Sequence, residues 1–332
     1  MPDQSSTPLQ VVVNGAAGNV AYALLFRLAA GDVFGTDTPI SLRLLDIEPS
    51  LPATQGTVME LEDGAFPLLR EVSVTSDPKV AFDGASYVAL LGALPRKQGQ
   101  ERGDLLKANG AIFKPLGQTL NEVAADDVRI LVVGNPCNTN CYIAQRNAPD
   151  IPADRWYAMT RLDHNRAVAQ LAIKSGTQVS DVTQLAIWGN HSATQYPDYA
   201  NALIGGRSAP EVIGDETWLE GEFVSIVQKR GAAILEARGL SSAGSAAAAI
   251  VDSLRAIHAP DAGQWVSAAV VSRGEYGVPE GLVFSYPLQG DGRGSLAVVD
   301  GVEHGKAGQA KLKITTDELL EERDAVADLI PS

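Results

Sequence analysis

Cysteine is scarce in this sequence, with Cys137 and Cys141 the only two among 332 residues. A chain of this length cannot depend on a disulfide framework, and so low a cysteine content is typical of a reducing compartment such as the cytoplasm. The spacing of four residues would place both thiols on one face of a helix, as in a metal-binding pair. Because no His or acidic partner is nearby, we interpret them as small buried hydrophobic residues and expect no metal site.

The sequence also lacks long apolar runs and an excess of positive charge. No stretch of about 18 apolar residues occurs, so we expect no membrane span. The first ten residues, MPDQSSTPLQ, contain no basic segment followed by an apolar one, and we expect no secretory signal. Lysine and arginine number 26 against 40 acidic residues, a net charge of −14 that argues against a nucleic-acid partner.

Short apolar runs alternate with amphipathic stretches in the first half of the chain. We interpret residues 9–14, 42–46, 87–92 and 130–135 as buried parallel strands, and residues 21–30 and 105–125 as helices. Strands that alternate with helices predict an α/β fold with a doubly wound parallel sheet. We assign residues 1–157 to this first domain.

The pattern changes in the second half, which we assign to a second domain of α+β type, residues 158–332. A strand at 156–160 leads to a helix beginning near Asp163 and to another strand at 184–188. Longer helices are expected at 216–238 and 243–257. An antiparallel set of strands follows at 265–272, 282–286 and 296–299, before a final helix at 316–329.

A glycine-containing loop, NGAAGNVA at residues 14–21, follows the first predicted strand and opens a helix. Gly15 permits a tight turn, Gly18 lets the helix N-terminus approach a pyrophosphate, and Ala21 is small enough for close packing. Many such turns bind nothing. Asp46 at the end of the second strand favours the dinucleotide, because its carboxylate could accept the ribose hydroxyls and would repel a 2′-phosphate, although strand-end aspartates also cap turns.

Four further segments carry polar or charged side chains at wide spacing: LPRKQGQERGDLLKAN from Leu94, VVGNPCNTN from Val132, TRLDHNRA from Thr160 and IWGNHSATQYPD from Ile187. Together with SRGEYGVPEGLVFSYP from Ser272, they resemble the malate dehydrogenases of the lactate/malate dehydrogenase family, in particular the cytosolic-type branch. The resemblance runs along nearly the whole chain. It implies a Rossmann-fold NAD-binding domain, a substrate-binding catalytic domain, a role in the tricarboxylic acid cycle and a homodimer.

The resemblance assigns acid–base catalysis to His191, paired with Asp163. Oxidation of a 2-hydroxy acid needs a base that takes the hydroxyl proton while hydride leaves C2, and histidine titrates in the right range. The aspartate would fix the tautomer and stabilise the imidazolium. A histidine taken alone is more often structural, and we interpret His164, His258 and His304 as surface or capping residues.

Three arginines would hold the two carboxylates of malate, since a guanidinium makes paired charged hydrogen bonds to a carboxylate. By the resemblance, Arg166 binds the C1 carboxylate, Arg96 binds the distal one, and Arg102 assists once its loop closes. Asn135 is expected to contact substrate and the nicotinamide ribose, and Ser245 to lie near them. The polar, glycine-rich segment around Arg96 and Arg102 is equally typical of a solvated loop, and the resemblance favours a lid.

The expected cofactor-binding set combines the glycine loop with three later segments. It comprises Gly15, Ala16, Ala17, Gly18, Asn19, Val20, Ala21, Asp46, Asn109, Val133, Gly134 and Asn135. One departure from the family pattern is Leu116, where relatives of this branch usually carry a Gln. If that side chain contacts NAD in relatives, the contact is lost or shifted in this chain.

Two other functions fit parts of the pattern. A lactate dehydrogenase would share the fold and the His–Asp pair, but would carry a neutral residue in place of Arg96, because an unpaired buried arginine is unfavourable. A catalytically idle NAD-binding protein would have lost His191, Asp163 or an arginine, and none of these is missing. The residues therefore favour malate as the substrate.

Overall fold

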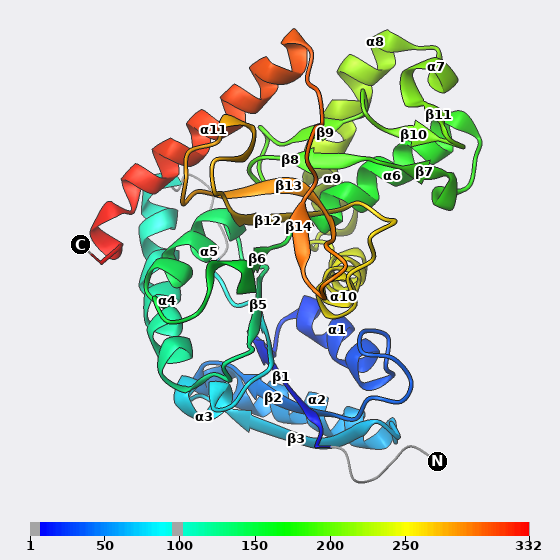
Figure 1. Ribbon diagram of the computed structural model, residues 1–332. Helices are drawn as coiled ribbons and strands as arrows, with labels where there is room; N and C mark the ends of the chain where they lie inside the picture. The colour runs from blue at the N-terminus through cyan, green and yellow to red at the C-terminus, as the bar shows by residue number, and fades with distance from the viewer. Residues whose placement is uncertain (1–6, 95–101, 332) are drawn as a thin grey trace. The chain divides into compact units, whose positions relative to one another are not determined.

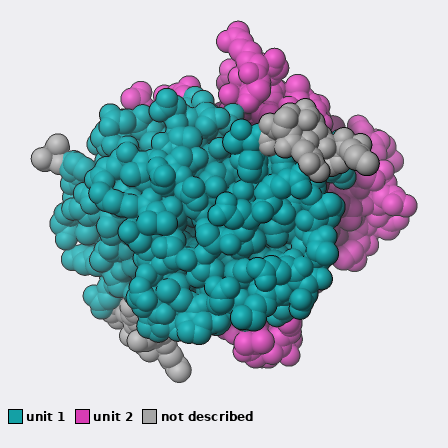
Figure 2. Space-filling view, turned by 90° about the horizontal axis from the view of Figure 1, so that it is seen from below, with its two compact units in different colours: residues 1–158, 322–332 teal, residues 159–321 magenta. Residues whose placement is uncertain are grey.

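A computed structural model describes residues 7–94 and 102–331 of the chain. It divides into two compact units (Figure 2), residues 1–158 with 322–332 and residues 159–321. In the described residues, no helix is long and apolar enough to cross a membrane.

Unit 1 contains a parallel sheet with the strand order β3-β2-β1-β4-β5-β6. The strands are β1 (Leu9–Asn14), β2 (Ile40–Leu45), β3 (Leu69–Thr75), β4 (Tyr87–Leu90), β5 (Arg129–Val132) and β6 (Trp156–Ala158). The order reverses between β1 and β4, as in the doubly wound fold that the sequence predicts. Ligands of such sheets bind beyond the carboxyl ends of the strands at this reversal.

Helices cover the sheet of unit 1, with α4 and α5 on one side and α1 on the other (Figure 1). They are α1 (Asn19–Ala29), α2 (Leu51–Asp63), α3 (Pro78–Phe82), α4 (Arg102–Val123) and α5 (Cys137–Arg146). The central strands are apolar because both of their faces are buried. Val12, Val13, Leu42 and Leu44, for example, are fully buried.

Unit 2 begins with α6 (Arg161–Ser175), which packs on the short strand β8 (Ala186–Trp188) and on α9 (Val224–Arg238) around a core that includes Leu171, Ile187 and Phe223. The remaining strands are β7 (Val182–Thr183), β9 (Tyr196–Asp198), β10 (Leu203–Ile204), β11 (Arg207–Ser208), β12 (Val266–Val271), β13 (Val283–Gly290) and β14 (Leu296–Val298). The remaining helices are α7 (Ala209–Ile213), α8 (Glu216–Trp218), α10 (Gly244–His258) and α11 (Lys306–Ala325).

Most predicted elements of unit 2 are confirmed. Strands β12, β13 and β14 pair antiparallel, and residues 216–238 form α8, a π-helical turn and α9 without interruption. The predicted start of the last helix at residue 316 is wrong, because α11 begins at Lys306. Its first turns are largely exposed and therefore lack the apolar periodicity that marks a helix in sequence.

Candidate functional site

The turn from β1 to α1 has the tight geometry that the glycine loop predicts. Gly15 has a φ of +72°, and a Cβ at this position would lie 2.6 Å from the backbone nitrogen of Gly92. Only glycine fits such a position without strain or clash. Helix α1 follows with Gly18 as its N-cap, and no side chain of the described residues caps it. The first-turn N–H groups and the helix dipole therefore favour an anion such as a pyrophosphate.

Asp46 lies beside this turn, one residue after β2. Its Oδ2 accepts a hydrogen bond of 2.8 Å from the backbone N–H of Ala17, and its Oδ1 accepts one of 2.8 Å from Ile47. The carboxylate thus ties the glycine loop to the end of β2. Each carboxylate oxygen has a second lone pair, so the ribose hydroxyls that the sequence assigns to Asp46 would still find an acceptor.

The carboxyl ends of β4 and β5 adjoin the same turn. The Asn14 side chain accepts a 2.9 Å hydrogen bond from the N–H of Gly92, and a Cβ on Gly134 would lie 2.8 Å from the Cβ of Ala93. Val133, Gly134 and the exposed Asn135 follow β5 directly. Asn14 and Gly92 belong to this turn but are not among the predicted site residues, although Gly92 ends a predicted strand and could have indicated this close approach.

Asn109 of α4 is buried, whereas most residues of the glycine loop are at least partly exposed. It is fully buried, its Oδ1 accepts a 2.7 Å hydrogen bond from the N–H of Leu94, and its Nδ2 donates to the carbonyl of Leu94 at 3.2 Å. The side chain therefore fixes the backbone at residue 94. Arg96 lies outside the described residues, and Arg102 is described only as the first residue of α4.

Within unit 2, Asp163 joins His191 and Arg166. Its Oδ2 bonds to Nδ1 of His191, and its Oδ1 accepts a 3.0 Å hydrogen bond from Arg166. Asp163 and Arg166 are three residues apart on α6 and share a face, while His191 follows β8. The Asp163 side chain is fully buried, whereas 15% of the His191 side chain remains exposed. The sequence predicted that these three residues meet, and they do.

The surroundings of His191 raise its pKa above the ordinary value of 6.5. Burial is the largest single influence and lowers the pKa, but the charge of Asp163 and its hydrogen bond together outweigh burial and the opposing charge of Arg166. Because Nδ1 faces Asp163, the tautomer with its proton on Nδ1 is favoured. The ring is then suited to exchange a proton at Nε2.

Arg166 keeps part of its hydrogen-bonding capacity open. Its Nε is buried and has no hydrogen-bond partner among the described residues, although only 13% of the side chain is exposed. A buried unpaired donor on a cation is unfavourable by itself, and a ligand carboxylate would satisfy it. This geometry suits the carboxylate-binding role that the sequence predicts for Arg166.

Two buried serines connect helix α6 to strand β8 through hydrogen bonds. Ser267 of β12 accepts a 2.9 Å hydrogen bond from the N–H of Ile187, and Ser285 of β13 donates one of 2.7 Å to the carbonyl of the same residue. Ser285 also bonds to Thr160, the residue before α6, at 2.6 Å, and Ser267 bonds to His164 of α6 at 2.9 Å. The strand before His191 and the helix that carries Asp163 therefore share the same buried anchors.

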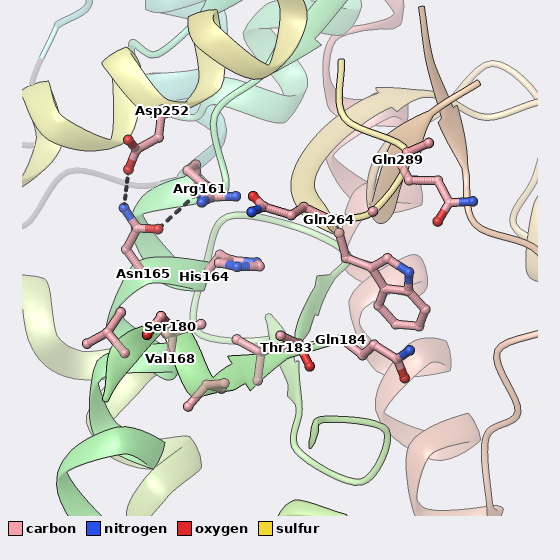
Figure 3. A pocket seen from close by; sticks show the side chains of 16 residues that line it. Arg161, His164, Asn165, Val168, Ser180, Thr183, Gln184, Asp252, Gln264 and Gln289 are labelled. Atoms are coloured by element: carbon pink, nitrogen blue, oxygen red, sulfur yellow. Dashed lines mark hydrogen bonds between the residues drawn. The ribbon is translucent and has the colours of Figure 1, made fainter. Parts of the chain in front are cut away.

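The assignment of His164 as a surface or capping residue is wrong. This histidine is buried and lines a separate cavity of about 700 Å³ together with Arg161 and Gln264 (Figure 3). Burial and, to a lesser extent, the charge of Arg161 hold the pKa of His164 well below its ordinary value. The lowered pKa makes His164 less able than His191 to carry the proton that a reduction needs.

His304 is also buried rather than at the surface, with 5% of its side chain exposed. Its ring lies 4.6 Å from that of Trp188 and close to the buried Asp198. Burial lowers its pKa, against the charge of Asp198. His258 is the last residue of α10, as expected of a helix-ending residue.

Ser245 and the two cysteines complete the predicted set. Ser245 is exposed in the first turn of α10. Cys137 and Cys141 are buried in α5 without a disulfide, and burial raises the pKa of the Cys141 thiol, in agreement with their interpretation as small hydrophobic residues. Across residues 7–94 and 102–331, no group of three His, Cys, Asp or Glu side chains is placed to hold a metal ion.

Comparison with known proteins gives two family matches. Residues 9–155 match the NAD binding domain of the lactate/malate dehydrogenases, and residues 160–330 match the α/β C-terminal domain of that family. The structure is similar to a malate dehydrogenase from Naegleria fowleri, with a TM-score of 0.95 and 46% identity over 98% of this chain and 100% of that one. It is also similar to a Trichomonas vaginalis lactate dehydrogenase in complex with NADH and oxamate, with a TM-score of 0.92 and 34% identity over 97% and 98% of the two chains.

Proposed function

Because this chain belongs to the lactate/malate dehydrogenase family and has NAD as its cofactor, we propose that it interconverts (S)-malate and oxaloacetate. The observation that carries the proposal is the buried Asp163, which bonds to His191 on one side and to Arg166 on the other. This arrangement provides an acid–base group and a carboxylate-binding cation on adjacent elements. Arg96 in the sequence and the 46% identity to a malate dehydrogenase favour malate over lactate.

We assign NAD to the glycine turn of unit 1. Gly15 has no Cβ, which would otherwise meet Gly92, so the turn stays open for the pyrophosphate. The first turn of α1 would face the pyrophosphate, and Asp46 would accept hydrogen bonds from the adenosine ribose hydroxyls. Residues Ala16 to Ala21, Asn109 and Val133 to Asn135 complete the proposed set. Bound NAD supplies the nicotinamide that accepts hydride from malate and, as NADH, returns it to oxaloacetate.

His191 is the proposed acid and base. In malate oxidation, its Nε2 takes the proton of the C2 hydroxyl as hydride leaves C2, and the imidazolium that forms is stabilised by Asp163. In the reverse direction, the same nitrogen returns the proton to the carbonyl oxygen. The contact between Nδ1 and Asp163 holds the ring in the orientation and tautomer that both directions require.

The arginines are the proposed determinants of substrate shape. Arg166 would bind the C1 carboxylate through its open donors, and Ser245 and Asn135 would contact the substrate near the reacting carbon. Arg96 would bind the distal carboxylate with help from Arg102. A dicarboxylate then satisfies a positive charge at each end, whereas lactate would leave the charge of Arg96 without a partner.

The experiment that tests the proposal measures kcat/KM for oxaloacetate and for pyruvate with NADH, in the wild type and in Arg96→Gln. We expect the wild type to prefer oxaloacetate. The variant should lose about 100-fold or more in the ratio of oxaloacetate to pyruvate, since removal of one partner from a desolvated charge pair costs about 3 kcal/mol or more. Arg293→Gln, at an exposed arginine in a turn of unit 2, is the control and should leave the ratio unchanged.

Each other outcome identifies a different error. If the wild type prefers pyruvate, it is a lactate dehydrogenase. If neither oxaloacetate nor pyruvate supports NADH oxidation, the chain is not an enzyme of this kind. An unchanged ratio in Arg96→Gln removes Arg96 from the site.

We also propose that the enzyme is a cytoplasmic homodimer. The support is the resemblance to the cytosolic-type branch, together with two buried cysteines that form no disulfide and so suit a reducing compartment. Sedimentation of the full chain at assay concentration distinguishes a dimer from a monomer.

A further inference from the structure

Helix α11 makes hydrogen bonds to the loop that carries His191, although the two segments are more than 120 residues apart in sequence. Thr315 of this helix is fully buried, and its Oγ1 accepts a 2.9 Å hydrogen bond from the N–H of Asn190. Gly189 has a φ of +91°, and a Cβ there would lie 2.2 Å from the Thr315 side chain. The backbone just before His191 therefore rests directly on α11.

One turn further along α11, Glu318 gathers the side chains around His191. Its Oε2 accepts hydrogen bonds from Asn190 Nδ2 at 2.9 Å, from Thr194 Oγ1 at 2.6 Å and from the hydroxyl of Ser192. An ionised carboxylate is an acceptor only, so three converging donors suit it. The three donors come from residues 190, 192 and 194, which enclose His191 in sequence.

Ser192 and Thr194 are partly exposed, so water could satisfy their hydroxyls in place of Glu318. Asn190, by contrast, is buried, with 2% of its surface exposed, and a buried amide that loses its partner is unfavourable by about 1–3 kcal/mol. Asn190, Ser192 and Thr194 thus each bond to the Glu318 carboxylate. Loss of these bonds would loosen the backbone on both sides of His191.

We propose that Glu318 is a positioning residue for the reaction, which holds the His191 loop so that Nδ1 of His191 meets Asp163. The inference rests on the proposed acid–base role of His191. A shift of about 1 Å in a catalytic group lowers rates by as much as 100-fold. In this role Glu318 acts through His191 and not on the substrate itself.

The test compares Glu318→Gln with the wild type by three measurements on the full chain. The variant keeps the side-chain length but places an amide among three donors. We expect kcat to fall about 10-fold or more, with the Kd for NADH changed by less than about twofold. The pKa of His191, followed by NMR with ¹³C-labelled histidine, should fall because the contact with Asp163 weakens while Arg166 and burial still oppose the charge.

The NMR titration needs no substrate, so it remains valid if malate is not the substrate, and the wild-type assay reveals that separate failure. The chain has four histidines, and the spectrum of His191→Asn identifies the relevant signal. Glu321→Gln, an exposed glutamate on the same helix, is the matched control and should match the wild type in all three measurements.

A second variant keeps the test decisive if Glu318→Gln does not fold. Thr194→Val keeps the shape of the side chain but removes its hydroxyl, which contacts Glu318 at 2.6 Å and Thr315 and Ser192 at 3.0 Å, and it should lower kcat and the pKa of His191 in the same direction by smaller amounts. Folded variants with wild-type kcat and an unmoved His191 titration would overturn the proposal. So would a loss of thermal stability with kcat and the titration unaffected, because that result makes the contact merely structural.

Discussion

Asp163 contacts both of the other residues of the proposed site on α6 and after β8, Arg166 and His191. A fully buried carboxylate needs compensating partners, and Asp163 has a guanidinium at 3.0 Å on one oxygen and the imidazole of His191 on the other. The pair with His191 is stronger when the imidazole is protonated, which is why its pKa is raised. In the proposed mechanism, the same contact therefore sets both the orientation of the ring and the pH range in which each direction of the reaction runs.

This pKa predicts opposite pH limits for the two directions. Malate oxidation needs neutral His191, so its kcat/KM should fall as the pH drops through an inflection above 6.5, whereas oxaloacetate reduction should fall as the pH rises through the same inflection. The linked stability has the sign of a raised pKa. It is fully present below pH 6.5 and is lost as the pH rises through the folded-state value.

Steady-state rates from about pH 5 to 9 check this prediction. In Asp163→Asn the inflection of the residual activity should move below 6.5, because burial and Arg166 then act on His191 without opposition. His258→Asn, at the end of α10, should keep the wild-type profile. An inflection at the same pH in Asp163→Asn and in the wild type would assign the titration to another group.

The His191, Asp163 and Arg166 trio could be predicted from the sequence because the motifs carry both the residue types and their spacing. His164 and His304 could not be placed in the same way. A histidine's burial depends on which side chains fold over it, such as Trp188 beside His304, and the chain around each residue is polar. Thr315 and Glu318 gave no signal at all, since their partners lie far away in sequence.

At the scale of elements, unit 1 depends on the close approach of two strand ends. The Gly15 turn after β1 and the Gly92 backbone after β4 approach so closely that a Cβ on either residue would meet atoms of the other segment. Strand β5 adds Gly134 beside the same segment. Three glycines at neighbouring strand ends leave a backbone-lined surface, which is what a pyrophosphate needs in order to reach the N-terminus of α1.

Gly15→Ala should therefore weaken NADH binding at least about 10-fold, because the Cβ must displace the backbone at Gly92 and the left-handed φ costs a further energy of about 1–2 kcal/mol. Fluorescence titration with NADH measures the effect. Gly35→Ala is the control, since Gly35 has a φ of +90° in the same unit but no atom within 4 Å of the position that the added methyl group would take. Equal losses in the two variants would attribute the effect to backbone strain alone.

Whether a strand can be predicted from the sequence depends on its position in the sheet. Strands β1, β2, β4 and β5 are central and read as apolar runs, with ends within three residues of those expected. Strand β3 was not predicted, because it forms the edge of the unit 1 order and its second and third residues, Arg70 and Glu71, are exposed. An edge strand with one exposed stretch lacks both of the periodic patterns used to find strands.

At the scale of the whole chain, the last residues belong to the same compact unit as the first half of the sequence. The sequence suggested that everything after residue 157 forms one domain, but residues 322–332 return to unit 1. There the carbonyl of Leu329 accepts a 3.0 Å hydrogen bond from Asn147 of the turn after α5, and Glu322 bonds to Thr139. No local pattern marks such a return, because the final helix has the same amphipathic character whichever unit it serves.

The contact between Leu329 and α4 gives a test of this closure. A Cβ on Gly110, in the interior of α4, would lie 2.1 Å from Cδ1 of Leu329. Alanine ordinarily stabilises a helix interior by about 1 kcal/mol relative to glycine. Gly110→Ala should therefore give no such gain in the wild-type background. In the Leu329→Ala background it should stabilise the chain by up to about 1 kcal/mol, because only the end of the Ile143 side chain, at 3.2 Å, still lies close to the added methyl group.

Urea unfolding of the two single variants and the double variant measures this coupling. Gly56→Ala, in the interior of α2 with no atom near the added methyl group, should give the same gain in both backgrounds because only helix propensity changes. If the Gly110→Ala effect were likewise independent of Leu329, the C-terminal segment would not be packed on α4 in solution. The stability of the cofactor-binding unit would then be independent of the residues that return to it.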